Sequence, residues 1–124
     1  MIAVYMIGNN DALSFNNRRV SSDKNIIDDL YKNYENINIF KRSEDLFKGR
    51  KYNIVDSLDD GIYFLEDNID KKIDTLIIYR FNRDYPYDNR LNIDLEKYSL
   101  IDTYDFRGNS HDKITKEVFE YEKD

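Results

Sequence analysis

The sequence contains no cysteine and only one histidine among its 124 residues. Without cysteine the chain has no disulfide, no thiolate metal ligand and no thiol nucleophile. The lone His111 excludes a metal site built from several histidines, and we expect no metal centre. Glycine is also scarce, since Gly8, Gly49, Gly61 and Gly108 are isolated from one another. No glycine-rich loop is therefore available to bind phosphate groups.

Long apolar stretches are missing as well. No run approaches the roughly 18–20 apolar residues that span a bilayer, and no signal-peptide pattern opens the sequence. We expect a cytoplasmic protein that does not enter membranes. A length of 124 residues fits one domain, residues 1–124, and 40% apolar residues are sufficient to form its core.

Acidic residues dominate the charge, with 25 acidic side chains against 19 basic ones and a formal net charge of −6. Such a surface repels a nucleic-acid backbone, because proteins bind phosphates mainly through Lys and Arg. We therefore expect no direct nucleic-acid binding. An acidic surface could suit a basic partner protein, or it could serve only to keep the protein soluble. The abundance of Asn, Ile, Lys, Asp and Tyr is typical of an AT-rich genome and suggests a low-GC bacterium or its phage.

Hydrophobic patterns predict the strands. Two near-continuous apolar runs, Met1–Ile7 and Thr75–Tyr79, are typical of buried central strands. Alternating apolar and polar residues over 98–106 and 114–122, with turn residues between them, predict an antiparallel hairpin. Short strands are expected at Ile37–Phe40 and Lys51–Val55.

Helical spacing of apolar residues predicts a helix over Lys24–Asn33, capped by Ser22 or Asp23. A second amphipathic helix is predicted over Ser57–Asp67. A shorter helix is expected at Ser43–Phe47, and loops at 8–21 and 80–92. Strands alternating with helices and ending in a hairpin predict an α/β fold, with a mostly parallel sheet flanked by helices and an antiparallel C-terminal hairpin.

Asp29 is the acid best placed for chemistry. It lies three residues after Ile26, at the edge of the apolar face of the predicted helix. Partial burial would raise its pKa and suit proton transfer, whereas a solvated helix acid is the alternative. Acids adjacent in sequence, such as Asp59 and Asp60, point about 100° apart on a helix and do not converge. His111 follows a turn and is expected to be exposed, so no Ser-His-Asp arrangement is predicted.

Several segments, taken in order, resemble the dihydrofolate reductase family. Residues Leu13–Ser22 resemble that family's mobile loop, with Val20-Ser21-Ser22 in place of its Leu-Pro-Trp triplet. Asp28-Asp29-Leu30 resembles the segment that carries the pterin-binding carboxylate. The resemblance implies that Asp29 and Leu30 contact the substrate, and that Asp29 is catalytic if the chain is a reductase.

Three later segments extend the resemblance. Lys48–Val55 resembles the family's Pro-Gly-Arg-Lys-Asn-Ile-Ile-Leu stretch, whose arginine binds the glutamate tail of folate, so Arg50 takes that role. A guanidinium suits a carboxylate because it can bond both oxygens. Asp88–Asn92 resembles the Asp-Thr-X-Phe-Pro signature, with Asn89 in place of its Thr and in the implied substrate site. Val118–Lys123 resembles the family's last strand.

The chain departs from the family at the cofactor site. The Met-Gly-Arg-X-Thr motif that holds the cofactor's phosphates is reduced to Phe40-Lys41-Arg42-Ser43, and the later Gly-Gly dipeptide beside an apolar strand is absent. Few residues separate the predicted 57–67 helix from the strand at Thr75, so a whole strand and its phosphate-binding turn are expected to be deleted. Backbone N–H groups at such a turn bind pyrophosphate. We therefore expect no bound cofactor.

Three interpretations remain open. The first is a shortened, degenerate dihydrofolate-reductase-like protein that binds a folate-like ligand or a basic host protein, as a phage or mobile-element inhibitor would, without NADPH-dependent reduction. The second is a minimal divergent reductase in which Asp29 helps protonate the pterin, Arg50 binds the glutamate tail and a rebuilt loop holds NADPH. The third is an unrelated small acidic α/β interaction module. The first two imply that Asp29 and Arg50 face one cleft.

Overall fold

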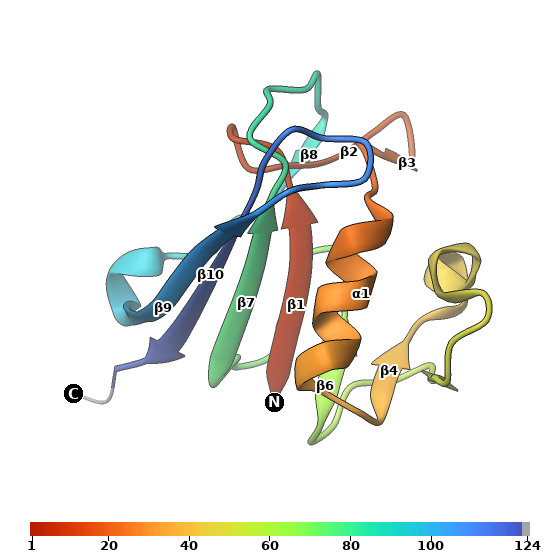
Figure 1. Ribbon diagram of the computed structural model, residues 1–124. Helices are drawn as coiled ribbons and strands as arrows, with labels where there is room; N and C mark the ends of the chain where they lie inside the picture. The colour runs from red at the N-terminus through yellow and green to blue at the C-terminus, as the bar shows by residue number, and fades with distance from the viewer. Residues whose placement is uncertain (123–124) are drawn as a thin grey trace.

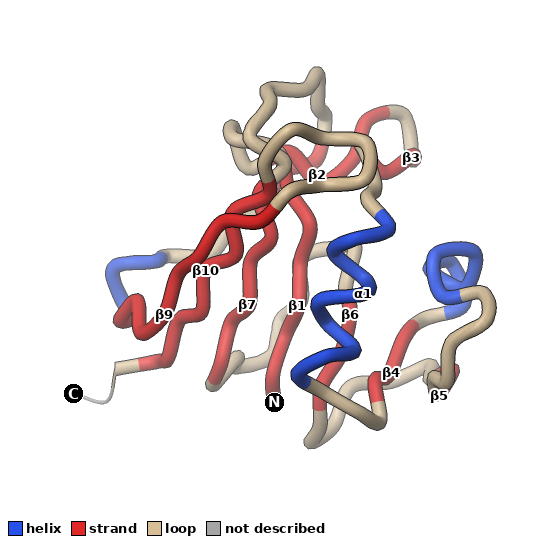
Figure 2. The backbone as a smooth tube through the Cα atoms, in the orientation of Figure 1, coloured by secondary structure: helices blue, strands red, loops and turns tan. Residues whose placement is uncertain are grey.

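The main sheet of the computed structural model, which describes residues 1–122, has seven strands. They are β1 (Ile2–Ile7), β4 (Ile37–Ile39), β5 (Asn53–Ile54), β6 (Ile62–Phe64), β7 (Thr75–Arg80), β9 (Tyr98–Phe106) and β10 (Ile114–Tyr121). Their order across the sheet is β5-β4-β6-β1-β7-β10-β9 (Figures 1 and 2). Strands β5 to β7 in this order run parallel, and β10 pairs antiparallel with β7 and β9. The predicted α/β architecture, with a C-terminal hairpin, is confirmed.

The two apolar runs of the sequence lie at the centre of this sheet. Strand β1 pairs with β6 on one side and with β7 on the other. Side chains from Ala3 to Ile7, and from Leu76 to Tyr79, are buried. Lys123, the last residue of the segment that resembles the family's final strand, lies outside the described residues.

Helix α1 (Lys24–Asn33) covers one face of the sheet (Figure 1). Its N-cap is Asp23, whose side chain accepts a hydrogen bond from the backbone N–H of Asn25, as expected for a short acidic cap. The apolar stripe of α1 packs against the sheet and contributes Ile26, Ile27 and Leu30 to the core. A second apolar layer on the opposite face includes Tyr5, Leu13, Leu76, Leu91 and Phe119.

The segments 8–21 and 80–92, predicted as loops, contain short strands. Strands β2 (Ala12–Phe15), β3 (Arg18–Arg19) and β8 (Asn89–Arg90) form a small second sheet above the carboxyl ends of β1 and β7 (Figure 1). Asn16 and Asn17 join β2 to β3 with φ of 51° and 62°, which asparagine tolerates in tight hairpin turns. Two 3₁₀ helices, η1 (Lys41–Phe47) and η2 (Leu95–Lys97), complete the described elements.

The helix predicted over Ser57–Asp67 is wrong, because this segment contains β6. Strand β6 lies between β4 and β1, and its residues Ile62–Phe64 are all buried. Consecutive burial fits a central parallel strand and not a helix with one apolar face. Gly61 has a φ of +122°, a conformation that helices do not contain.

The expected deletion of a whole strand is therefore wrong as well. A buried apolar strand, β6, is present in this stretch, and Leu65-Glu66-Asp67 follows it without a glycine. Among residues 1–122, no helix has the length and apolar character needed to cross a membrane.

Candidate functional site

Asp29 lies at the centre of a buried polar cluster between α1 and the antiparallel side of the sheet. Its Oδ2 accepts a hydrogen bond of 2.6 Å from the hydroxyl of Tyr79 on β7, and its Oδ1 accepts one of 2.6 Å from Tyr104 on β9. Lys116 on β10 places its ammonium group 3.1 Å from Oδ2. The side chains of Asp29 and Lys116 are 12% and 4% exposed, so water has little access to either charge.

Three aromatic rings complete the surroundings of Lys116. Its ammonium nitrogen lies 5.2 Å from the ring centre of Tyr104, 5.5 Å from that of Tyr79 and 5.8 Å from that of Tyr34. Aromatic faces attract cations, and they do so more strongly where water is excluded. The four elements α1, β7, β9 and β10 are thus joined through one carboxylate and one ammonium group.

The expectation that burial raises the pKa of Asp29 is wrong. Burial alone acts in that direction, but the hydrogen bonds from Tyr104 and Tyr79 and the charge of Lys116 outweigh it and hold the pKa below its usual value. Burial, together with the hydrogen bond to the same carboxylate, raises the pKa of Tyr79. Asp29 is therefore an ionised group with both oxygens occupied. It is neither a solvated acid nor a proton donor at neutral pH.

The other residues implied by the resemblance lie apart from Asp29. Arg50 forms an ion pair with Asp28 and places its guanidinium carbon 5.2 Å from the ring centre of Tyr31. It lines a cavity of about 290 Å³ beside the first turn of α1, and Asp29 is not among the residues that line it. Leu30 is completely buried in the core under α1.

Asn89 belongs to a second polar cluster, at the carboxyl ends of the parallel strands. In α/β sheets this edge is the usual place for ligands. The side-chain amide of Asn89 donates to Ser14 Oγ at 3.2 Å and to Asp67 Oδ1 at 3.1 Å. Asp67 follows β6 and also forms an ion pair of 2.5 Å with Arg42.

Arg19, on β3, holds the centre of this second cluster. Its guanidinium group bonds both oxygens of Glu66, at 2.9 and 3.0 Å, and both oxygens of Asp45, at 2.7 and 3.0 Å. Ser43 donates a further bond of 2.5 Å to Glu66, whose side chain is 6% exposed. We call Arg19, Arg42, Ser43, Asp45, Glu66 and Asp67 the carboxyl-edge network.

The carboxyl-edge network includes part of the segment that the resemblance assigns to cofactor phosphates. Arg42 and Ser43 come from the segment in place of the family's Met-Gly-Arg-X-Thr motif, and Glu66 and Asp67 lie just after β6. Three carboxylates face two guanidinium groups, so the formal charge of the network is negative. Its cations are already paired, and its excess charge repels an anionic ligand.

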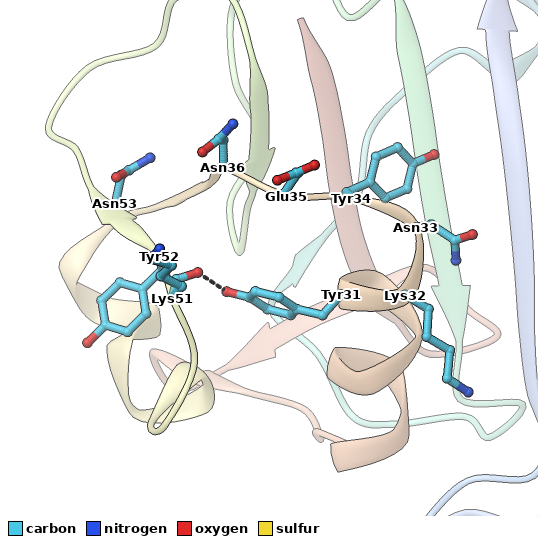
Figure 3. A pocket seen from close by; sticks show the side chains of 9 residues that line it. All are labelled: Tyr31, Lys32, Asn33, Tyr34, Glu35, Asn36, Lys51, Tyr52 and Asn53. Carbon is cyan, nitrogen blue, oxygen red and sulfur yellow. Dashed lines mark hydrogen bonds between the residues drawn. The ribbon is translucent and has the colours of Figure 1, made fainter.

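A further hollow lies at the other end of α1 (Figure 3). It has a volume of about 520 Å³, and its walls come from the end of α1, the loop that leads to β4 and the start of β5. The Tyr31 hydroxyl donates a hydrogen bond of 2.6 Å to the carbonyl of Lys51 across it. Its lining residues are Tyr31, Lys32, Asn33, Tyr34, Glu35, Asn36, Lys51, Tyr52 and Asn53.

The expectation that His111 is an exposed loop residue is wrong. Its ring stacks on Phe81 at a centroid distance of 4.7 Å, and its side chain is 3% exposed. Nδ1 lies 2.8 Å from the buried carboxylate of Asp23, and Nε2 lies 3.0 Å from the hydroxyls of Ser21 and Tyr85. The turn Arg107–Ser110 folds back over the N-terminus of α1 and thereby buries the histidine that follows it.

No protein-family model and no curated protein matches the sequence. Among solved structures, the chain is similar to dihydrofolate reductase from Enterococcus faecalis, in a complex with NADP(H) and the compound RAB-propyl. The TM-score is 0.68 at 10% sequence identity, and the match covers 98% of this chain and 96% of that chain. The chain therefore has a dihydrofolate-reductase-like fold.

Proposed function

We propose that this chain is a binding protein that uses a dihydrofolate-reductase-like fold without NADPH-dependent reduction. The carboxyl-edge network is the observation that carries the proposal. A pyrophosphate is normally bound by free backbone N–H groups and cationic side chains. Here the two arginines of the network, Arg19 and Arg42, are paired with Asp45, Glu66 and Asp67. Binding of NADPH would have to break these pairs and bring more negative charge beside Glu66.

The buried cluster around Asp29 supports the same conclusion. In a reductase this carboxylate would face the pterin ring, but here hydroxyls from Tyr79 and Tyr104 and the ammonium of Lys116 occupy its two oxygens. Opening this cluster would leave Lys116 buried and unpaired, which is costly. The minimal-reductase interpretation therefore requires two separate rearrangements, one at each cluster.

The first prediction is that NADPH does not bind measurably. In a titration that follows energy transfer from the protein's tyrosines to the reduced nicotinamide, we expect no saturable signal up to about millimolar NADPH, which corresponds to less than about 4 kcal/mol of binding free energy. A bacterial dihydrofolate reductase measured in parallel provides the positive control. Saturable binding in the micromolar range would contradict the proposal and favour the minimal reductase.

The partner we propose is a basic protein that adds an extended segment to β9. Strand β9 forms the last position of the sheet, with β10 as its neighbour among the described strands. Leu100 and Ile101 on β9 are each 51% exposed. Opposite them, the pairing of β9 with β10 shifts register between Val118 and Phe119. Free strand edges pair readily with extended segments. Asp102 and Asp105 on the same strand favour a basic segment over an acidic one.

A second prediction tests this edge with a nine-residue peptide of alternating lysine and valine. In two-dimensional NMR spectra we expect shift changes concentrated on β9. Leu100→Ser together with Ile101→Ser should weaken binding at least about tenfold, since two exposed apolar contacts are lost without a change of charge. Ile54→Ser is the matched control, because Ile54 is 47% exposed on the strand at the opposite edge. Equal weakening by the control, or equal binding of a glutamate-valine peptide, would contradict this partner.

A folate-like ligand is the second candidate, and the 520 Å³ hollow beside Tyr31 is the observation that favours it. Lys32 and Lys51 line it and could attract a carboxylate tail, whereas Arg50 is paired with Asp28. A thermal-shift screen with folate, methotrexate and NADPH separates the candidates, because a ligand that binds the native state raises the melting temperature.

A further inference from the structure

Two residues that immediately precede α1, Ser21 and Asp23, form a Ser-His-Asp arrangement with the sequence-distant His111. Asp23 Oδ2 lies 2.8 Å from His111 Nδ1, and His111 Nε2 lies 3.0 Å from Ser21 Oγ. These contacts have the connectivity of a serine nucleophile, its base and the carboxylate that orients the base. They are independent of the Asp29 cluster and of the carboxyl-edge network.

The carboxylate of Asp23 is fixed by several donors. Backbone N–H groups of Asn25, Asn109 and Ser110 donate to it at 2.9, 2.8 and 3.0 Å. Burial alone raises the pKa of Asp23, but the hydrogen bonds from Asn109, His111 and Ser110 outweigh it and keep the pKa below its usual value. Gly108 makes this approach possible, because a Cβ there would lie 2.6 Å from Asp23 Oδ2.

An ionised Asp23 determines which nitrogen of His111 carries the proton. The carboxylate accepts a hydrogen bond from Nδ1–H, so Nε2 keeps its lone pair and faces the hydroxyl of Ser21. Stacking on Phe81 holds the ring in this orientation. Asp23 and His111 are buried, whereas Ser21 is partly exposed and can meet a reagent from solvent.

We propose that Ser21 is a nucleophile activated by His111 and Asp23, and that it accepts an acyl group from small activated esters. In this step Ser21 Oγ bonds to the carbonyl carbon, and its proton passes to His111 Nε2. The bond to the leaving oxygen then breaks, and that oxygen takes the proton from His111. The products are an ester on Ser21 and an alcohol, while Asp23 stabilises the imidazolium formed between the two transfers.

Tyr85 regulates this nucleophile through competition for the same nitrogen. Its hydroxyl lies 3.0 Å from Nε2, the same distance as Ser21 Oγ. A neutral imidazole offers one lone pair there, so the two hydroxyls share it. Removal of the Tyr85 hydroxyl should leave Nε2 to Ser21 and should raise the reactivity of the serine. A purely structural cluster would show no such gain.

A fluorophosphonate probe tests the proposal, because it phosphonylates activated serines and releases fluoride. We expect one adduct on the native protein, located on Ser21 by peptide mass spectrometry. Tyr85→Phe should label about twofold faster, the factor for two equivalent donors sharing one acceptor. His111→Gln should label at least about a hundredfold more slowly. Ser22→Ala, which alters an exposed neighbouring serine, should label at the wild-type rate.

An unlabelled wild-type protein would overturn the proposal, as would an adduct on Ser22 or Ser110 or an unchanged rate in Tyr85→Phe. The site of the adduct is read from the wild-type protein, so the result does not depend on the folding of a variant. Tyr85→Phe keeps the aromatic ring that contacts Phe81 and Gly8. Its melting temperature shows whether the variant has the native fold.

Discussion

Replacement of Asp29 with asparagine is expected to lower the free energy of unfolding by about 3–5 kcal/mol, the range seen when one partner of a buried ion pair is removed. The reason is that Lys116, whose side chain is 4% exposed, would keep its charge without a carboxylate. Tyr79 and Tyr104 would also lose a charged acceptor for their hydroxyls. Urea denaturation followed by circular dichroism measures the loss.

A double-mutant cycle attributes this loss to the pair. Lys116→Met alone leaves Asp29 with two tyrosine donors, and Asp29→Asn with Lys116→Met removes both buried charges. We expect the double variant to be more stable than Asp29→Asn alone, because replacement of a buried pair as a whole is often neutral. Asp28→Asn is the matched control. Its side chain is 37% exposed in the ion pair with Arg50, and exposed pairs contribute about 1 kcal/mol or less.

The dependence of stability on acid pH gives a second test of the role of the Asp29 carboxylate. A carboxyl group whose pKa is lower in the folded chain than in the unfolded chain stabilises the fold at neutral pH. That contribution is lost as the pH falls below about 3.9, the value for an unfolded aspartate, towards the folded pKa. Asparagine does not titrate, so Asp29→Asn should lose less of its remaining stability in acid. An equally steep acid dependence in both proteins would contradict the role of Asp29.

Local patterns were sufficient for much of the fold. The apolar stripe of Lys24–Asn33 and its Asp23 cap predict α1 correctly, because the residues of a helix face and of its cap lie within one continuous stretch of sequence. The alternation in 98–106 and 114–122 likewise identifies β9 and β10, which pair with each other. Strand β6 was missed because Leu58, Ile62 and Leu65 coincide with helical spacing. The two aromatic residues between Ile62 and Leu65 carry the contrary signal, since a continuous apolar run favours a buried strand.

The sites were harder to predict because their partners are distant in sequence. The resemblance selects Asp29, but nothing near it in the sequence indicates that Tyr79, Tyr104 and Lys116 will contact its oxygens from three different strands. Alternation does place Tyr104 and Lys116 on one face of the hairpin, where they pair directly across the strands. His111 gives no local sign of burial, because its burial depends on a turn that reaches the helix cap at Asp23.

Replacement of Arg19 is expected to have the second large effect on stability, because Arg19 joins the small β2–β3 hairpin to the carboxyl edge of the main sheet. Its guanidinium group bonds both Glu66 and Asp45, and its NH2 group also donates to the carbonyl of Arg42 at 3.0 Å. We expect Arg19→Met to lower the free energy of unfolding by about 2–3 kcal/mol, below the range for fully buried pairs because the side chain of Arg19 is 23% exposed. Glu66 would remain buried with Ser43 as its donor.

Amide hydrogen exchange should locate the effect of Arg19→Met in residues 12–19, since the hairpin loses its attachment to the sheet. Arg19→Lys should recover less than half of the stability, because an ammonium group cannot bond two carboxylates as a fork does. Glu66→Gln should recover part of it in the Arg19→Met background by removing the unpaired charge. Arg18→Met is the matched control, because Arg18 is the exposed neighbour on the same strand. Equal destabilisation by Arg18→Met, or faster exchange spread over the whole sheet, would show that Arg19 does not anchor the hairpin through Glu66.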